Sequence, residues 1–240
     1  MKLAAKVRSS AAICDTTAEP RAHRTPKPTP AFTGRDVVAR LAGAATSDLW
    51  GNPKINSGGG LWSTPSIDAG GTLYMDVANP APFPGTPKYP NGASRPGRNL
   101  YTDSLVALNA RTGKLKWYFQ AIAHDIRDYD LQLPPILATF TIGGRPRDVV
   151  IAGGKMGTVY VVDRHTGRLI WKRNVGRHNK WGDPSRPFPT KASQFPLTMY
   201  PGDLGGIETP MATAGGVIYV PVVDLCTKIT AQKPDRKSTR

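Results

Sequence analysis

A repeated thirteen-residue unit constrains the fold of this chain more than any other feature. Residues 105–117 read LVALNARTGKLKW, residues 159–171 read VYVVDRHTGRLIW, and the two align without a gap. The aligned positions include two turn residues and a closing tryptophan: Asn109 with Asp163, Gly113 with Gly167, and Trp117 with Trp171. A repeat of about fifty residues with about four strands in each unit is typical of radially arranged β-sheets.

Each unit predicts a strand, a tight turn and a returning strand. Gly113 and Gly167 supply the positive φ that a tight turn requires. The side chain of Asn109 or Asp163 is suited to accept hydrogen bonds from the amides of its turn. The tryptophan that follows has a large apolar face, which we expect to lie across the neighbouring unit.

Short apolar runs separated by glycine and proline indicate an all-β chain. The sequence holds 25 glycines and 23 prolines, and no long window carries a convincing helical stripe. The long proline-rich segment at 79–98 suggests a functional loop over a rigid scaffold. The predicted strands are Trp62–Asp68, Thr72–Val77, Ser104–Asn109, Leu115–Gln120, Val149–Ala152, Thr158–Asp163, Leu169–Asn174 and Val217–Val223.

The pattern divides the chain into three parts. Residues 1–47 are poorly patterned, and their proline- and arginine-rich stretch at 19–34 predicts disorder. One short helix is expected at 35–45, and no clear secretory signal is visible. Residues 48–230 carry the strands, and residues 231–240 form a polar tail.

Charge and hydropathy exclude two classes of partner. The formal net charge is +15, but the basic residues are scattered between turns rather than gathered on one helix. Sequence-specific nucleic-acid binding is therefore not expected, although weak adhesion to polyanions at low salt is. No apolar run reaches the roughly 18 residues that a membrane span requires.

The stretch HDIRDYDL at 124–131 contains the densest group of chemically active side chains. Asp128 and Asp130 are two positions apart, so in an extended segment their carboxylates point the same way. Two such charges repel unless a cation lies between them, and paired carboxylate oxygens suit calcium or a trivalent ion of similar size. The alternative is a solvated acidic loop.

Four motifs resemble the quinoprotein alcohol dehydrogenases, which are eight-bladed β-propellers that bind pyrroloquinoline quinone (PQQ). The repeated unit is similar to the tryptophan-docking motif of that family. Three further segments follow in the family's order: GGGLW at 58–62, NPAP at 79–82, and HDIRDY at 124–129. The resemblance covers roughly residues 50–230 and implies a partial, open propeller of four-stranded antiparallel blades.

The resemblance also implies roles for single residues. Trp62 would form the floor under the quinone, Asn79 would bind a metal ion, and Asp128 would be the catalytic base and a metal ligand. Asp130 would add an anionic ligand, which within this family is associated with a lanthanide rather than calcium. The alternatives are a core aromatic at Trp62, a simple turn residue at Asn79, and a carboxylate at Asp130 that caps the next turn.

The function implied is oxidation of a small alcohol by hydride transfer to PQQ, with a calcium or lanthanide ion polarising the quinone. A cytochrome-type electron acceptor and a periplasmic location are implied in the same way. His124 is expected to brace the loop by hydrogen bonds rather than to carry protons.

Several departures leave a second hypothesis open. Only three or four blades are expected, a metal-binding glutamate of the family has no counterpart, and we therefore expect an internal piece of a longer gene product or a truncated open reading frame. Open sheet edges favour self-association. The alternative function is a non-catalytic propeller fragment that serves as a scaffold for protein contacts.

Overall fold

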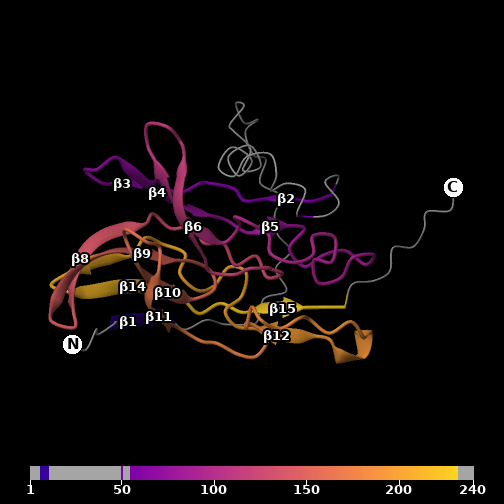
Figure 1. Ribbon diagram of the computed structural model, residues 1–240. Helices are drawn as coiled ribbons and strands as arrows, with labels where there is room; N and C mark the ends of the chain where they lie inside the picture. Colours follow the sequence, from indigo (N-terminus) through magenta and orange to yellow (C-terminus); the bar gives the residue numbers. More distant parts are fainter. Residues whose placement is uncertain (1–5, 11–49, 51–54, 232–240) are drawn as a thin grey trace, which may run out of the picture.

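The structure, a computed structural model, describes residues 6–10, 50 and 55–231 (Figure 1). The regular structure in these residues is almost entirely β-strand, with a 3-10 turn at Ala192–Gln194. This confirms the predicted all-β class. None of the helices in the described part of the chain has the length and apolar character that crossing a membrane requires.

The first sheet contains the first copy of the repeated unit. Its strands run antiparallel in the order β3-β4-β6-β7, so each strand pairs with the next one in sequence. The sheet occupies the top of the view in Figure 1. Its strands are β3 (Ser66–Ile67), β4 (Thr72–Val77), β6 (Ser104–Asn109) and β7 (Leu115–Gln120).

The second sheet contains the second copy and has the same connectivity. Its order is β11-β10-β9-β8, again antiparallel between consecutive strands. These two sheets confirm the four-stranded antiparallel blades that the resemblance implies. The strands are β8 (Ile136–Ile142), β9 (Arg145–Gly153), β10 (Thr158–Asp163) and β11 (Leu169–Asn174).

The remaining strands form smaller sheets. β13 (Ala212–Ala214) and β14 (Val217–Val223) form a hairpin, and β1 (Lys6–Ser10) joins β14 in parallel. Two short antiparallel pairs complete the fold. They are β12 (Leu197–Met199) with β15 (Thr227–Ile229), and β2 (Ser57–Gly58) with β5 (Pro80–Ala81).

The central strands of the second sheet, β9 and β10, are buried on both faces over Val149–Gly153 and Thr158–Val162, which explains their continuous apolar runs. Val150 and Ala152 of β9 pack with residues of the first sheet in one core cluster. Val149 and Ile151, which alternate with them, pack with Ile218 and other residues of β14 in a second cluster. Successive side chains of a strand point to opposite faces, so a strand between two sheets needs apolar residues at every position. Within the described residues the sheets stack face to face as an open arc.

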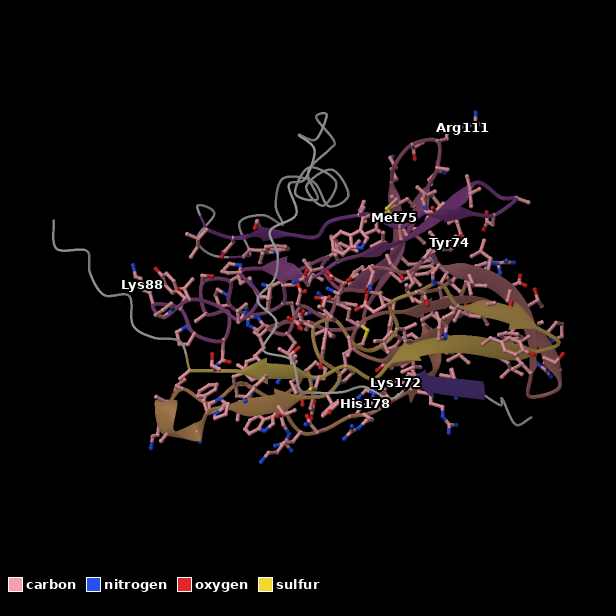
Figure 2. All side chains as sticks on the ribbon, turned by 180° about the vertical axis from the view of Figure 1, so that it is seen from behind. Tyr74, Met75, Lys88, Arg111, Lys172 and His178 are labelled. Carbon is pink, nitrogen blue, oxygen red and sulfur yellow. The ribbon has the colours of Figure 1, made fainter. Side chains whose placement is uncertain are left out.

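The repeated turns have the predicted hydrogen bonds. Oδ1 of Asn109 accepts from the amides of Arg111 and Thr112 at 3.0 and 2.9 Å. Oδ1 of Asp163 accepts from the amides of its own turn at 3.1 and 2.9 Å. Figure 2 shows Arg111 at the tip of the first turn, which projects away from the body of the molecule.

The tryptophan of the first unit docks on the second unit, as predicted. Nε1 of Trp117 donates to the carbonyl oxygen of Arg164 at 3.1 Å. A Cβ atom added at Gly167 would lie only 2.5 Å from Cε3 of Trp117, so the ring lies against the bare backbone of the second turn. Tyr74 of β4, labelled in Figure 2, packs against the same ring with centroids 5.8 Å apart. The repeat therefore joins one sheet to the next.

Three predictions of local structure need correction. The strand expected over 62–68 is reduced to the two residues of β3, and the strand expected over 149–152 is the end of the longer β9. β1 lies inside the segment in which no strand was expected, and its backbone pairs with the edge of β14. The disorder predicted at 19–34 and the helix predicted at 35–45 lie outside the described residues.

Candidate cofactor and metal site

Three of the four predicted site residues meet around one lysine. Nζ of Lys155 lies 2.8 Å from Oδ2 of Asp128 and 2.6 Å from Oδ2 of Asp130. Nδ2 of Asn79 donates to Oδ1 of Asp128 at 2.9 Å, and the amide of Asn79 donates to Oδ1 of Asp130 at 3.0 Å. Both carboxylates therefore face Asn79 and Lys155, and neither belongs to a solvated acidic loop.

A buried carboxylate fixes the backbone of Asp128. Asp125 is fully buried and accepts hydrogen bonds from the amides of Arg127 at 2.8 Å and Tyr129 at 2.7 Å, the residues on either side of Asp128. Asp128 has a φ of +64°, a left-handed conformation that few residues other than glycine adopt. The segment is therefore a turn that hydrogen bonds to Asp125 hold in place. It is not the extended segment that the sequence analysis considered.

The proline-rich loop over 79–98 places Asn79. The loop is tied down by Arg95, which is fully buried and donates to the carbonyl oxygens of Pro82, Phe83 and Asp125. The carbonyl oxygen of Asn79 also accepts from the amide of Gly59 at 2.9 Å. One guanidinium therefore links the loop that carries Asn79 to the turn that carries Asp128.

Lys155 was not predicted from the sequence. It lies in the turn between β9 and β10, and its amide donates to the carbonyl oxygen of Asp130 at 3.1 Å. A Cβ atom at Gly154 would lie 2.0 Å from that same carbonyl oxygen, so only glycine permits the approach. The signal available in the sequence was a lysine within the glycine-rich turn GGKMG at 153–157.

Burial and ion pairing shift the pKa values of this cluster in opposite directions. Burial raises the pKa of Asp130, and the hydrogen bond from Lys155 only partly offsets that effect. Burial alone would lower the pKa of Lys155, but its hydrogen bonds to Asp128 and Asp130 outweigh burial and raise that pKa. The ammonium is therefore held charged between the two carboxylates.

Two further acids among the described residues are buried without hydrogen-bond partners. Both carboxylate oxygens of Asp103 are buried and unpaired, and so are both oxygens of Asp76. Burial raises the pKa of each carboxyl well above its usual value, and the charges of Asp125 and Asp130 raise that of Asp103 further. Burial also raises the pKa of Asp125 to about 6.

Trp62 is 62% exposed, which excludes the alternative of a core aromatic. Its ring folds back over Gly60, where an added Cβ atom would lie 2.9 Å from Cζ3. The carbonyl oxygen of Gly60 accepts from the amide of Ala78, the residue before Asn79, at 3.0 Å. The segment that carries Trp62 is therefore attached to the segment that carries Asn79, with the ring open to solvent.

His124 braces the loop, as expected. Nδ1 lies 3.0 Å from the carbonyl oxygen of Gly97, and Nε2 lies 3.0 Å from that of Asn91.

The sequence analysis did not identify Gln132 and Glu208. Nε2 of Gln132 donates a hydrogen bond to Oε2 of Glu208 at 3.3 Å.

The donors present fit a hard cation. Asp128, Asp130 and the amide oxygen of Asn79 are the oxygen ligands that calcium and trivalent ions of similar size accept. Among the described residues no three or more His, Cys, Asp or Glu side chains are grouped so that they could hold a metal ion, and the set here is two carboxylates and one amide. The ammonium of Lys155 shows that a positive charge is stable between the two carboxylates.

Comparison with known proteins gives a consistent result. Residues 32–217 match the sequence model of the PQQ family described as glucose/ethanol/alcohol dehydrogenase, beta-propeller domain. The chain is 31% identical over 170 residues to the quinohemoprotein alcohol dehydrogenase of Comamonas testosteroni, and 41% identical over 131 residues to the quinoprotein glucose dehydrogenase of Escherichia coli K12. The alignments span 67% and 48% of this chain.

Solved structures agree with the sequence matches. The crystal structure of the Comamonas testosteroni enzyme superimposes with a TM-score of 0.58, covering 72% of this chain and 27% of that one. A europium-containing methanol dehydrogenase superimposes with a TM-score of 0.56 at 26% identity, covering 69% of this chain and 30% of that one. The chain spans only 23% and 16% of the two curated relatives.

Proposed function

Because the chain belongs to the β-propeller family of PQQ-dependent glucose, ethanol and alcohol dehydrogenases, we propose that its described residues provide the base and metal ligands of a PQQ site. The reaction proposed is oxidation of an alcohol. The observation that supports it is the convergence of Asn79, Asp128 and Asp130 from two loops far apart in sequence.

Asp128 is the general base in this proposal. Its side chain is 25% exposed and that of Asp130 is 2% exposed, so a substrate hydroxyl would reach Asp128 first. Its carboxylate oxygens accept hydrogen bonds from Asn79 and Lys155, which orient the group, and a carboxylate is the kind of side chain that accepts a hydroxyl proton. The turn fixed by Asp125 holds the carboxylate in position.

The cofactors would be held by residues of both loops. When bound, PQQ supplies a carbon that accepts hydride, and the metal ion polarises the quinone carbonyl. Trp62 would offer its exposed ring as a stacking surface for the quinone, and Asn79, Asp128 and Asp130 would be the metal ligands. An aromatic face beside a cation matches the flat, anionic shape of PQQ.

Asp130 favours a lanthanide over calcium in this proposal. A second carboxylate raises the negative charge available to a trivalent ion. One structural neighbour is a europium-containing methanol dehydrogenase. Restored activity with calcium but not with lanthanum would contradict this part of the proposal.

The physiological partners are proposed from the family alone. The Comamonas testosteroni relative is named a quinohemoprotein alcohol dehydrogenase. We propose a small alcohol as substrate, a cytochrome-type electron acceptor and a periplasmic location on that basis.

The experiment that tests the base is Asp128→Asn. The substitution keeps the shape and removes the proton acceptor, so dye-linked alcohol oxidation with PQQ and metal should fall by about 10²–10⁴-fold. PQQ binding should remain measurable by tryptophan fluorescence. Turnover equal to that of the wild type would contradict the role of Asp128, and absence of PQQ binding in the wild-type chain would favour the scaffold function.

A further inference from the structure

A hollow lined by arginines lies at the end of the second sheet that is away from the candidate site. It has a volume of about 670 Å³, which is within the range of small-molecule binding sites. The residues of β9 lead from this hollow to the turn that carries Lys155 and span about 25 Å. Figure 1 shows β8 at the left of the view, away from β5, which follows Asn79. The hollow is therefore separate from the proposed PQQ site.

One wall of the hollow is a hairpin that is longer than its counterpart in the first sheet. In the first sheet the strand β4 begins opposite Asn109 of the repeated unit. In the second sheet β9 begins at Arg145, before the residue that lies opposite Asp163. Arg145 and Arg147 lie on this extension two positions apart, so their side chains leave the same face of the strand. The repeat alone therefore does not account for these arginines.

The less exposed part of the hollow is apolar, and the opposite wall is the turn of the second repeated unit. Ile142 and Ile170 line the hollow and pack against the second core cluster. Arg168 and Asp163 line it from the turn. Oδ1 of Asp163 accepts hydrogen bonds from the amide and the hydroxyl of Thr166 at 2.9 and 2.8 Å, so this acid is engaged by its own turn.

Three guanidinium groups line the hollow without a counter-charge. Arg145, Arg147 and Arg168 are all exposed, and within the described part of the chain their side chains make no hydrogen bond or ion pair. Arg164, by contrast, is paired with Asp148. Three arginines and one aspartate give the lining side chains an excess of positive charge, which repels a metal ion and attracts an anion.

We propose that this hollow binds a small organic anion that carries two or three carboxylate or phosphate groups on an apolar body. The guanidinium of arginine is a rigid fork of donors that matches both groups with paired hydrogen bonds. Arg145 and Arg147 hold the ligand from the hairpin, and Arg168 holds it from the turn. The apolar body lies against Ile142 and Ile170, which a purely inorganic anion would leave uncovered.

Isothermal titration calorimetry with benzene-1,3,5-tricarboxylate tests this site. Arg147→Gln and Arg168→Gln should each weaken binding by about three- to tenfold, the loss expected when a charged hydrogen bond at an exposed site is removed. Propane-1,2,3-tricarboxylate, which has the same number of carboxylates and less apolar surface, should bind more weakly than the aromatic probe. The control is Arg111→Gln, which removes an arginine from the turn of the first unit that Figure 2 shows and should change the affinity by less than about twofold.

Three results would overturn the site. Absence of binding to the wild-type chain is one. An equal loss in Arg111→Gln and Arg147→Gln would mean that the net charge of the chain, rather than the hollow, attracts the probe. Binding that neither Arg147→Gln nor Arg168→Gln weakens would place the probe elsewhere, the PQQ site included. Each of these results leaves the proposed function unaffected, because that function depends on other residues.

Discussion

At the scale of single residues, the described part of the chain contains carboxylates paired with a cation and buried carboxylates without a partner. Asp128 and Asp130 share the ammonium of Lys155, whereas Asp76 and Asp103 are buried with both oxygens unpaired. A buried carboxylate without a partner is stable only when protonated. The two unpaired acids therefore lower the stability of the fold at neutral pH.

Asp76→Asn should stabilise the protein at pH 8 more than at pH 5. Because burial raises the pKa of Asp76 above 3.8, the folded state holds a proton that the unfolded state has lost. Stability therefore falls as pH rises above about 4, until the pH reaches the pKa of the folded state. Removing the acid should add about 1–3 kcal/mol to the free energy of unfolding at pH 8, measured by urea denaturation.

The control for this prediction is Asp148→Asn. Hydrogen bonding from Thr139 lowers the pKa of Asp148, and its pairing with Arg164 acts in the same direction. Its removal should not stabilise the protein at either pH. If Asp76→Asn raises the free energy of unfolding by the same amount at pH 5 and pH 8, ionisation of Asp76 does not destabilise the fold.

The sequence identifies the acids of the site but not their counter-ion. Asn79, Asp128 and Asp130 could be predicted because each lies in a motif with a family counterpart. Lys155 could not be predicted, because a lone lysine in a glycine-rich turn has the composition of a solvated loop. Its role depends on a close approach to the carbonyl oxygen of Asp130, which only the folded backbone produces.

At the scale of elements, the turn between paired strands determines how the sheets join. Gly113 and Gly167 have φ values of +70° and +69°, so both turns need the same backbone freedom. They differ in their surroundings, because Gly167 contacts the ring of Trp117 and nothing lies within 4 Å of a Cβ atom at Gly113. The same motif therefore has a conformational role in one copy and an additional packing role in the other.

Alanine at the two glycines should separate these roles. Gly113→Ala should lower the free energy of unfolding by about 1 kcal/mol, because alanine is strained in the left-handed conformation. Gly167→Ala adds a collision with Trp117 at 2.5 Å and should cost roughly 2–4 kcal/mol. Urea unfolding measures both, and equal losses would mean that Trp117 does not dock on the second turn.

Six of the eight predicted strands have the bounds that the structure shows. Thr72–Val77, Ser104–Asn109 and Thr158–Asp163 are runs that turn residues delimit on both sides. The strand β8 was missed, although the alternation of exposed Thr139 and buried Phe140 is a period-two signal. β1 could not be predicted, because its pairing with β14 depends on backbone contacts rather than on an apolar pattern.

At the scale of the whole molecule, the described sheets stack in sequence order and share two cores. The second sheet contributes to both, so it is the centre of the arc. The candidate site forms where the loops of the first sheet meet the turn between β9 and β10. Its formation therefore depends on the packing of the first two sheets.

Open sheet edges should lead to self-association. β3 and β7 are edge strands of the first sheet, and unpaired edge groups are available to another copy of the chain. Sedimentation velocity should show a mean mass that rises with protein concentration. A monomer at all concentrations would contradict the expectation that these edges are accessible.

The most direct test is a titration with PQQ followed by tryptophan fluorescence, with and without lanthanum. If Trp62, Asn79, Asp128 and Asp130 form one site, lanthanum should make the quenching saturable and tighter. Asp130→Ala should remove the effect of lanthanum, and Trp62→Ala, but not Trp62→Phe, should weaken binding of PQQ. Quenching that is absent, or that is the same with and without lanthanum, would contradict the account.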